Sequence, residues 1–305
     1  MGLIRRLLLN RFALVGLVWL AAIAALHVGQ IRHNRLPLDL TREFPVGEPM
    51  TPGMALGTTL AVVMGHELDD NFGWRPNDFF LWGPRLWADN NAQRQLGVLQ
   101  AVRETVRVLK DHLTKVSSDQ FDQNLVEADT MFRNDARKLW FPSAESRYRQ
   151  GVQHLVAYVR GLKPELGTSK PIHQRHMELL RLFQAWTDLL GDAHANLYRT
   201  EKDGRRLRPW ETDDLFYRAQ GFAHVMAYGI EALERDYAPA LAERETLRIL
   251  FAEVKASLFH AALLKPFVVL DGPPAGLTAN HRRNLDTYVT EARQKMYSIR
   301  EELEK

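Results

Sequence analysis

The chain has 305 residues, of which 46% are hydrophobic and 25% are charged, and it contains no cysteine. This length allows one large core or two modest ones, and the lack of cysteine excludes disulfides, thiolate catalysis and cysteine-ligated zinc. The 40 basic and 37 acidic residues are interspersed along the chain and give a formal net charge of +3, so the composition argues against a nucleic-acid partner, which would need clustered basic residues.

The N-terminal segment, residues 1–31, has the charge pattern of a membrane-inserting helix. Three arginines precede an uninterrupted apolar run from Phe12 to Leu26. Fifteen helical residues cover about 22 Å, which is short of a hydrocarbon core of ~30 Å, so a full span has to extend toward Ile31. Because cations flank the segment on its N-terminal side, we predict a single-pass anchor with the N-terminus in the cytoplasm.

The alternative for the same segment is a cleaved signal peptide. The Ala-Ile-Ala sequence at residues 22–24 offers a cleavage site after an apolar region of ordinary length. Under either interpretation the rest of the chain is exported. We therefore predict a protein of the bacterial inner membrane whose main domain lies in the periplasm.

The remaining chain is predicted to be a linker followed by helices. Residues 32–50 contain several prolines without helical periodicity and predict a flexible linker. From residue 51, apolar spacings of three and four predict a multi-helix bundle, all-α in fold class, that forms the extracytoplasmic domain 51–305. The predicted helices cover 52–68, 99–113, 121–140, 143–158, 172–197, 212–233, 247–261 and 278–303. No segment shows the alternation or Asn-Gly turn of a β-hairpin.

Several polar side chains are suited to begin these helices. The predicted N-caps are Thr51, Ser117 with Gln120 as a capping box, Ser143, Thr212 and Thr278. The two acids Asp213 and Asp214 are expected in the first turn of their helix, where carboxylates complement the helix dipole.

The densest polar and aromatic stretch runs from His66 to Asn91. Its carboxylates Asp69, Asp70 and Asp78, with Asn71, are candidates for general acid–base catalysis or for binding calcium or magnesium. The structural alternative is that these side chains cap helices and form turns, while the tryptophans anchor an irregular loop to the core. We favour the structural role and predict no resident metal.

Other candidate residues are weaker. His173 and His176 stand three apart and are suited to share a helix face, but one core and one surface histidine is the simpler interpretation. The loop 272–281 opens a helix whose amides, with His281, are suited to an anion, but a simple entry into the helix is the favoured interpretation. The chain lacks Glu-x-x-His pairs, H-E-x-x-H, G-x-S-x-G, the Walker loop and G-x-G-x-x-G, so we predict no cofactor.

Four strings, LDDNFGWRPND, LWFPSAESRYRQG, TDDLFYRAQGFAH and GLTANH, in this order and spacing, resemble an uncharacterised bacterial family of single-pass inner-membrane proteins. The resemblance spans roughly Thr58 to Leu303. It implies a helical extracytoplasmic body behind one N-terminal anchor, and it assigns no catalytic residue.

The leading hypothesis is a non-catalytic, membrane-anchored scaffold or binding module that uses a face of its bundle to bind another envelope component, protein or lipid. The alternative is an envelope hydrolase, metal-assisted or carboxylate-based, that uses Asp69, Asp70 and Asp78. A third hypothesis, a small-ligand sensor, requires an enclosed apolar pocket between helices.

Overall fold

A computed structural model gives the structure of the chain. It describes residues 11–22, 24–25, 35–45, 50–70, 73–77, 85–114, 121–174, 176–264, 266, 269–272 and 279–305. The structure is 73% helix and 2% strand, which confirms the all-α prediction.

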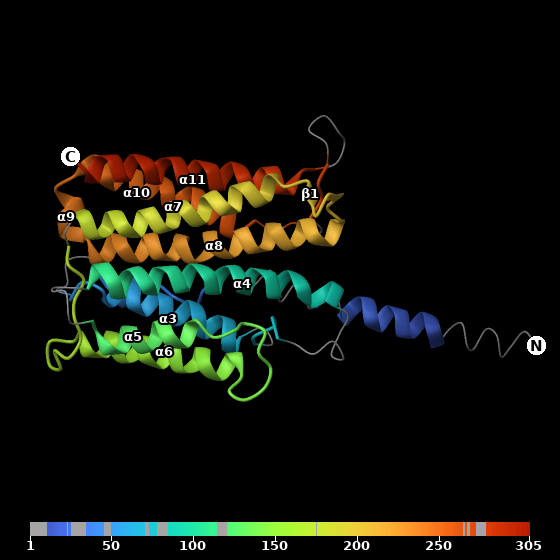
Figure 1. Ribbon diagram of the computed structural model, residues 1–305, viewed down its shortest axis with the longest axis horizontal. Helices are drawn as coiled ribbons and strands as arrows, with labels where there is room; N and C mark the ends of the chain where they lie inside the picture. The colour runs from blue at the N-terminus through green and yellow to red at the C-terminus, as the bar shows by residue number, and fades with distance from the viewer. Residues whose placement is uncertain are drawn as a thin grey trace, which may run out of the picture.

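The elements follow one another as α2 (Leu40–Glu43), α3 (Met54–Asp69), α4 (Arg85–Val108), the π-helical turn η2 (Leu109–Leu113), α5 (Gln123–Phe132), α6 (Ala144–Gly161), α7 (His176–Tyr198), β1 (Glu201–Lys202), β2 (Arg205–Arg206), α8 (Pro209–Asp236), α9 (Ala238–Ala242), α10 (Glu245–Ala262) and α11 (His281–Leu303). Most of the long helices run along the same axis (Figure 1). The helices α4 and α8 form the centre, with α3, α5 and α6 on one side and α7, α10 and α11 on the other.

The central pair of helices touches through glycine. A Cβ atom built on Gly97 of α4 would lie 2.2 Å from the carbonyl oxygen of Arg218 and 3.1 Å from the Cα of Gly221 on α8. The reciprocal Cβ on Gly221 would lie 2.3 Å from the carbonyl oxygen of Arg94. The two backbones are therefore in direct contact at a point where no larger residue fits.

The helix α4 begins fourteen residues before the start predicted from its apolar stripe. Its core-facing positions remain at helical spacing toward the N-terminus, but they are occupied by the buried polar residues Asn91, Arg94 and Gln95. The Arg94 Nη2 donates to both carboxylate oxygens of Glu67 on α3, at 2.6 and 2.7 Å. Buried polar side chains, among them the Arg94–Glu67 pair, thus extend the core-facing stripe of α4 beyond its apolar residues. A search for apolar residues at helical spacing therefore finds only the C-terminal part of this helix.

Two other helix boundaries also differ from the predictions. The helix α5 ends at Phe132 rather than near residue 140, because the chain turns there and the Asp135 side chain accepts from the backbone N–H of Arg137 at 3.0 Å. The helix α8 begins at Pro209 instead of at Thr212, since Glu211 accepts from the Arg208 N–H and closes a capping box. Asp213 and Asp214 consequently lie beyond the first turn.

The helix starts show which predicted caps form. Ser143 caps α6 as predicted, accepting from the Ser146 N–H at 3.3 Å. The cap of α3 is Gly53 rather than Thr51, and Asp236 supplies the acceptors from the end of α8. Ser117, Gln120 and Thr278 lie outside the described residues. The caps seen for α5 and α11 are Asp122 and Asn280.

A short β-hairpin follows α7, although the sequence analysis predicted none. The strands β1 and β2 pair antiparallel with Glu201 opposite Arg206 and Lys202 opposite Arg205. The turn residues Asp203 and Gly204 have φ of 53° and 74°. Asp-Gly is a hairpin turn signal of the same kind as Asn-Gly. The strands beside it have two residues each, which is too short for an alternation of apolar and polar residues to be recognised.

The predicted linker packs on the bundle where it is described. Leu36, Leu40 and Phe44 are buried, and the Leu36 N–H donates to the Tyr228 hydroxyl on α8 at 3.1 Å. Residues 35–45 therefore belong to the core rather than to a free flexible stalk.

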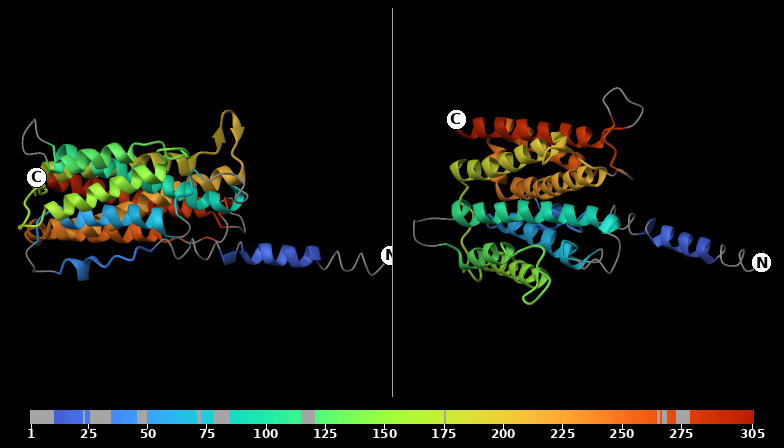
Figure 2. Two further views of the ribbon diagram at one scale, coloured as in Figure 1. Left: turned by 90° about the horizontal axis from the view of Figure 1, so that it is seen from below. Right: turned by 45° about the vertical axis from the view of Figure 1, so that its right-hand side comes forward.

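The helical residues 11–22 project away from the bundle (Figures 1 and 2). Their large apolar side chains are 49–73% exposed, namely Phe12, Leu14, Val15, Leu17, Val18, Trp19 and Leu20. Within the described ranges, no helix combines the length and the apolar character needed to cross a membrane.

Candidate functional site

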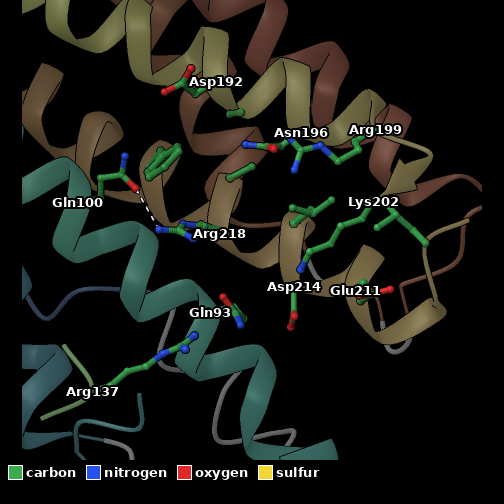
Figure 3. Close-up of a pocket in the computed structure, with 15 residues that line it drawn as sticks. Gln93, Gln100, Arg137, Asp192, Asn196, Arg199, Lys202, Glu211, Asp214 and Arg218 are labelled. Atoms are coloured by element: carbon green, nitrogen blue, oxygen red, sulfur yellow. Dashed lines mark hydrogen bonds between the residues drawn. The ribbon is translucent and has the colours of Figure 1, made fainter. Parts of the chain in front are cut away.

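A polar cleft of about 450 Å³ lies between α4, α7 and α8, beside the β-hairpin and the chain between α5 and α6 (Figure 3). Its volume falls in the range of small-molecule sites, roughly 300–1,000 Å³. The lining residues are Gln93, Gln100, Arg137, Asp192, Ala193, Asn196, Arg199, Lys202, Leu207, Glu211, Asp214, Leu215, Arg218, Ala219 and Phe222.

The glycine contact between α4 and α8 positions one wall of the cleft. Gln93 and Gln100 lie one turn before and one turn after Gly97 on α4, while Arg218 lies one turn before Gly221 on α8. Residues three and four apart share a helix face, so the side chains beside each glycine converge at the crossing. The Arg218 Nη2 donates to the Gln100 Oε1 at 3.3 Å, as Figure 3 shows.

The acidic residue nearest the hairpin is already engaged. Both carboxylate oxygens of Glu211 accept from the Arg205 guanidinium at 2.6 Å, and one of them also accepts from the Arg208 N–H at 2.9 Å. These hydrogen bonds from Arg205 and Arg208 lower the pKa of Glu211 to about 2. Glu211 therefore stays ionised at neutral pH and is a poor general base.

The cleft consequently carries an excess of positive charge. Arg205 lies outside the lining and neutralises Glu211. The remaining charged lining residues are the cations Arg137, Arg199, Lys202 and Arg218 and the acids Asp192 and Asp214. An open, cation-rich concavity of this kind attracts anions.

Two of these cations influence each other directly. Burial lowers the pKa of Arg218, the positive charge of Arg137 lowers it further, and Asp214 opposes both effects. Within the described parts of the chain, no hydrogen bond or ion pair engages the guanidinium of Arg137. The protein thus holds two guanidinium groups close enough to repel each other.

The predicted candidates Asp69 and Asp70 are not among the residues that line this cleft. Asp69, at the end of α3, forms an ion pair with Arg149 of α6. Asp70 lies 2.6 Å from the His66 Nδ1 on the preceding helical turn. Asp78 and Asn71 lie outside the described residues.

Trp74 and Asn77 of the same stretch anchor it to the chain between α5 and α6. The Trp74 Nε1 donates to the Ala136 carbonyl at 2.9 Å, and the Asn77 Nδ2 donates to the Lys138 carbonyl at 3.2 Å. In the described ranges, no group of three or more His, Asp or Glu side chains is arranged to hold a metal ion.

The histidine and loop candidates have separate positions. His173 precedes α7, and its backbone N–H donates to the Leu113 carbonyl at 2.8 Å. His176 begins α7, but its side chain is not among the described ones. The His281 Nδ1 accepts from the Leu270 N–H at 2.9 Å, so this nitrogen is used to close the loop before α11.

Sequence reasoning missed the cleft because its residues come from three separate segments of the chain, namely 93–100, Arg137 and 192–222. Two local signals were present. Gln93 and Gln100 are polar and stand seven residues apart on one face of α4, and the Asp203–Gly204 turn brings Lys202 beside α8. Neither signal states which other segment completes the site.

The fold and the cleft define an all-α bundle protein with a polar, cation-rich cleft between its central helices. The chain belongs to a bacterial family described as uncharacterized protein conserved in bacteria (DUF2333), whose model matches residues 2–200 and 183–305. This confirms the resemblance to an uncharacterised bacterial family, while the membrane anchor implied by that resemblance stays a prediction. No curated protein and no solved structure matches the chain.

Proposed function

We propose that the protein is a non-catalytic, membrane-anchored module of the bacterial envelope that binds its ligand in the cleft between α4, α7 and α8. The observation that carries this proposal is the set of donors that line the cleft. Arg137, Lys202 and the amides of Gln93 and Asn196 face an open volume, and among the described residues no hydrogen bond or ion pair engages the Arg137 guanidinium. Of the acids that line the cleft, Glu211 is held by Arg205. Such a donor-rich site is suited to bind and orient a polar anion rather than to move a proton.

The chain between α5 and α6 offers a second contact surface next to the cleft. Trp140 and Phe141, three and four residues after the cleft residue Arg137, are 75% and 97% exposed. Exposed neighbouring aromatic residues are common at interaction surfaces. They support a ligand that is part of a larger envelope component, protein or lipid.

The exposed apolar helix at residues 11–22 supports the proposed anchor. A row of large apolar side chains in water is unfavourable by roughly 25 cal/mol per Å² of apolar surface, so this helix favours an apolar environment. Together with the arginines before it, it supports a position in the inner membrane with the bundle in the periplasm.

Fractionation tests the anchor. Cells are separated into soluble and membrane fractions, and the N-terminus of the mature protein is sequenced. Retention in membranes with an intact N-terminus is expected. A soluble product that begins near Ala25 would refute the anchor and leave export in place.

Site-specific photocross-linking tests the binding role. A photoreactive amino acid replaces Asn196 in the cleft, and the control carries it at Arg160, an exposed position on α6 outside the cleft. Irradiation of intact cells should give a discrete adduct from position 196 and none from position 160. Identical patterns at both positions would count against the cleft as the binding site.

A further inference from the structure

We infer that the cleft recognises a phosphate group held between Arg137 and Arg218, on a small phosphorylated molecule or a lipid headgroup. This inference rests on the proposed function, because it names the ligand chemistry of the same cleft.

The two guanidinium groups lie near the same helix of the cleft. Figure 3 shows the side chains of Arg137, Gln93 and Arg218 beside α4. Arg137 comes from the chain between α5 and α6, whereas Arg218 comes from α8, so the two groups approach from different directions. Donors from several directions match the tetrahedrally arranged oxygens of phosphate better than the two coplanar oxygens of a carboxylate.

The charge of the cleft fits a dianion. Arg205 neutralises Glu211, so the lining has four cations and the two acids Asp192 and Asp214, and its net charge is positive. A phosphate monoester carries close to two negative charges at neutral pH. Its binding would neutralise that surplus and remove the repulsion between Arg137 and Arg218.

The cleft is larger than the phosphate group alone requires. Beyond the arginine pair, it continues toward Asn196 and Lys202, and its lining includes the apolar side chains of Leu215 and Phe222. Amide groups and a partly apolar floor suit the polar, hydroxyl-bearing remainder of a phosphorylated molecule.

Calorimetric titration of the full-length protein in phosphatidylcholine nanodiscs tests the inference. Inorganic phosphate and glycerol 3-phosphate are the probes, while acetate and glycerol test whether a carboxylate or hydroxyls suffice. Saturable binding of both phosphates is expected. Tighter binding of acetate than of inorganic phosphate would overturn the inference.

The variants Arg137→Gln and Arg218→Gln should each weaken phosphate binding at least tenfold. The control Arg160→Gln makes the same change in net charge at an exposed position of α6 outside the cleft. It should leave the affinity for phosphate within twofold of the parent. Because Arg137 is on a surface segment and Arg218 on the central helix, a folding defect in the second variant would leave the first informative. Equal affinities in all three variants would overturn the inference.

A second set of nanodiscs identifies the source of the phosphate group. If the cleft takes a lipid headgroup, adding phosphatidate should weaken glycerol 3-phosphate binding by competition in the parent protein but not in Arg137→Gln. Unchanged affinity would point to a soluble ligand. Cross-links from position 196 without any binding of phosphate would overturn the phosphate inference and leave the proposed binding function intact. If neither cross-links nor phosphate binding is seen, the inference and the proposed function are both overturned.

Discussion

Replacing Gly97 with alanine should separate the two central helices. The new Cβ would lie 2.2 Å from the Arg218 carbonyl oxygen, where an ordinary contact between carbon and oxygen is about 3.3 Å. The atoms in the way belong to the backbone of α8, so no side chain can rotate to make room. The helices must therefore move apart by about 1 Å, and a gap of that size removes up to about half of the dispersion energy of each contact along the interface.

The expected net effect follows from two opposing contributions. Alanine favours the helix over glycine by about 1 kcal/mol, while overpacking of a tight core costs typically 1–3 kcal/mol and occasionally more. In addition, α4 and α8 share the most extensive contact between described helices, which places the cost at the upper end. We expect Gly97→Ala to lower the free energy of unfolding by about 1–2 kcal/mol.

The chain provides a matched control. Gly65 lies within α3, and a Cβ built there meets no atom within 4 Å. Gly65→Ala should raise the free energy of unfolding by about 0.5–1 kcal/mol, because only the helix preference changes. Urea unfolding followed by circular dichroism measures both. A Gly97→Ala protein as stable as the parent would refute the backbone contact on which the geometry of the cleft depends.

Three further predictions concern buried residues. Leu40→Ala should cost about 2–5 kcal/mol because Leu40 is buried, whereas Leu166→Ala at an exposed loop position should change stability by less than about 0.5 kcal/mol; equal midpoints in urea would mean that residues 35–45 do not pack on the bundle. Glu67→Leu should lower the free energy of unfolding by about 3–5 kcal/mol, because it leaves Arg94 buried without its carboxylate partner. The double variant with Arg94→Met should recover much of this stability. A double variant less stable than the single one would contradict the prediction. Burial raises the pKa of Asp236 from 3.8 to about 7, although three amide hydrogen bonds oppose the shift. Between about pH 4 and pH 7 the folded state therefore binds a proton that the unfolded state does not, so the free energy of unfolding should fall as pH rises through this range, by up to about 1.4 kcal/mol per pH unit from this group. The urea midpoints at pH 5 and pH 8 should differ less in Asp236→Asn than in the parent.

The sequence by itself determined which segments are helical and which of their faces are apolar. Leu99, Val102 and Val106 repeat at helical spacing and are buried in α4, and Ser143 begins α6 as its residue type predicts. These features depend on side chains a few residues apart, so a local pattern contains the information needed.

Only the tertiary structure decided how polar residues are used. Arg94 belongs to the core because Glu67 lies opposite it on another helix, and Asp236 accepts from the Gly53, Ala55 and Leu56 amides across 180 to 183 residues of sequence. A charged residue is compatible with burial only when a distant partner satisfies it, and that partner cannot be read from the local sequence.

The cleft depends on tertiary structure for the same reason. Arg137 and Arg218 are 81 positions apart and show no motif, yet the glycine contact between α4 and α8 and the turn after α5 bring them to one cavity. The sequence determined only that both are charged. The packing of backbone against backbone at Gly97 and Gly221, together with the turn that carries Arg137, decided that both line the same cleft, because the approach of two helices is set by the smallest residues at their contact.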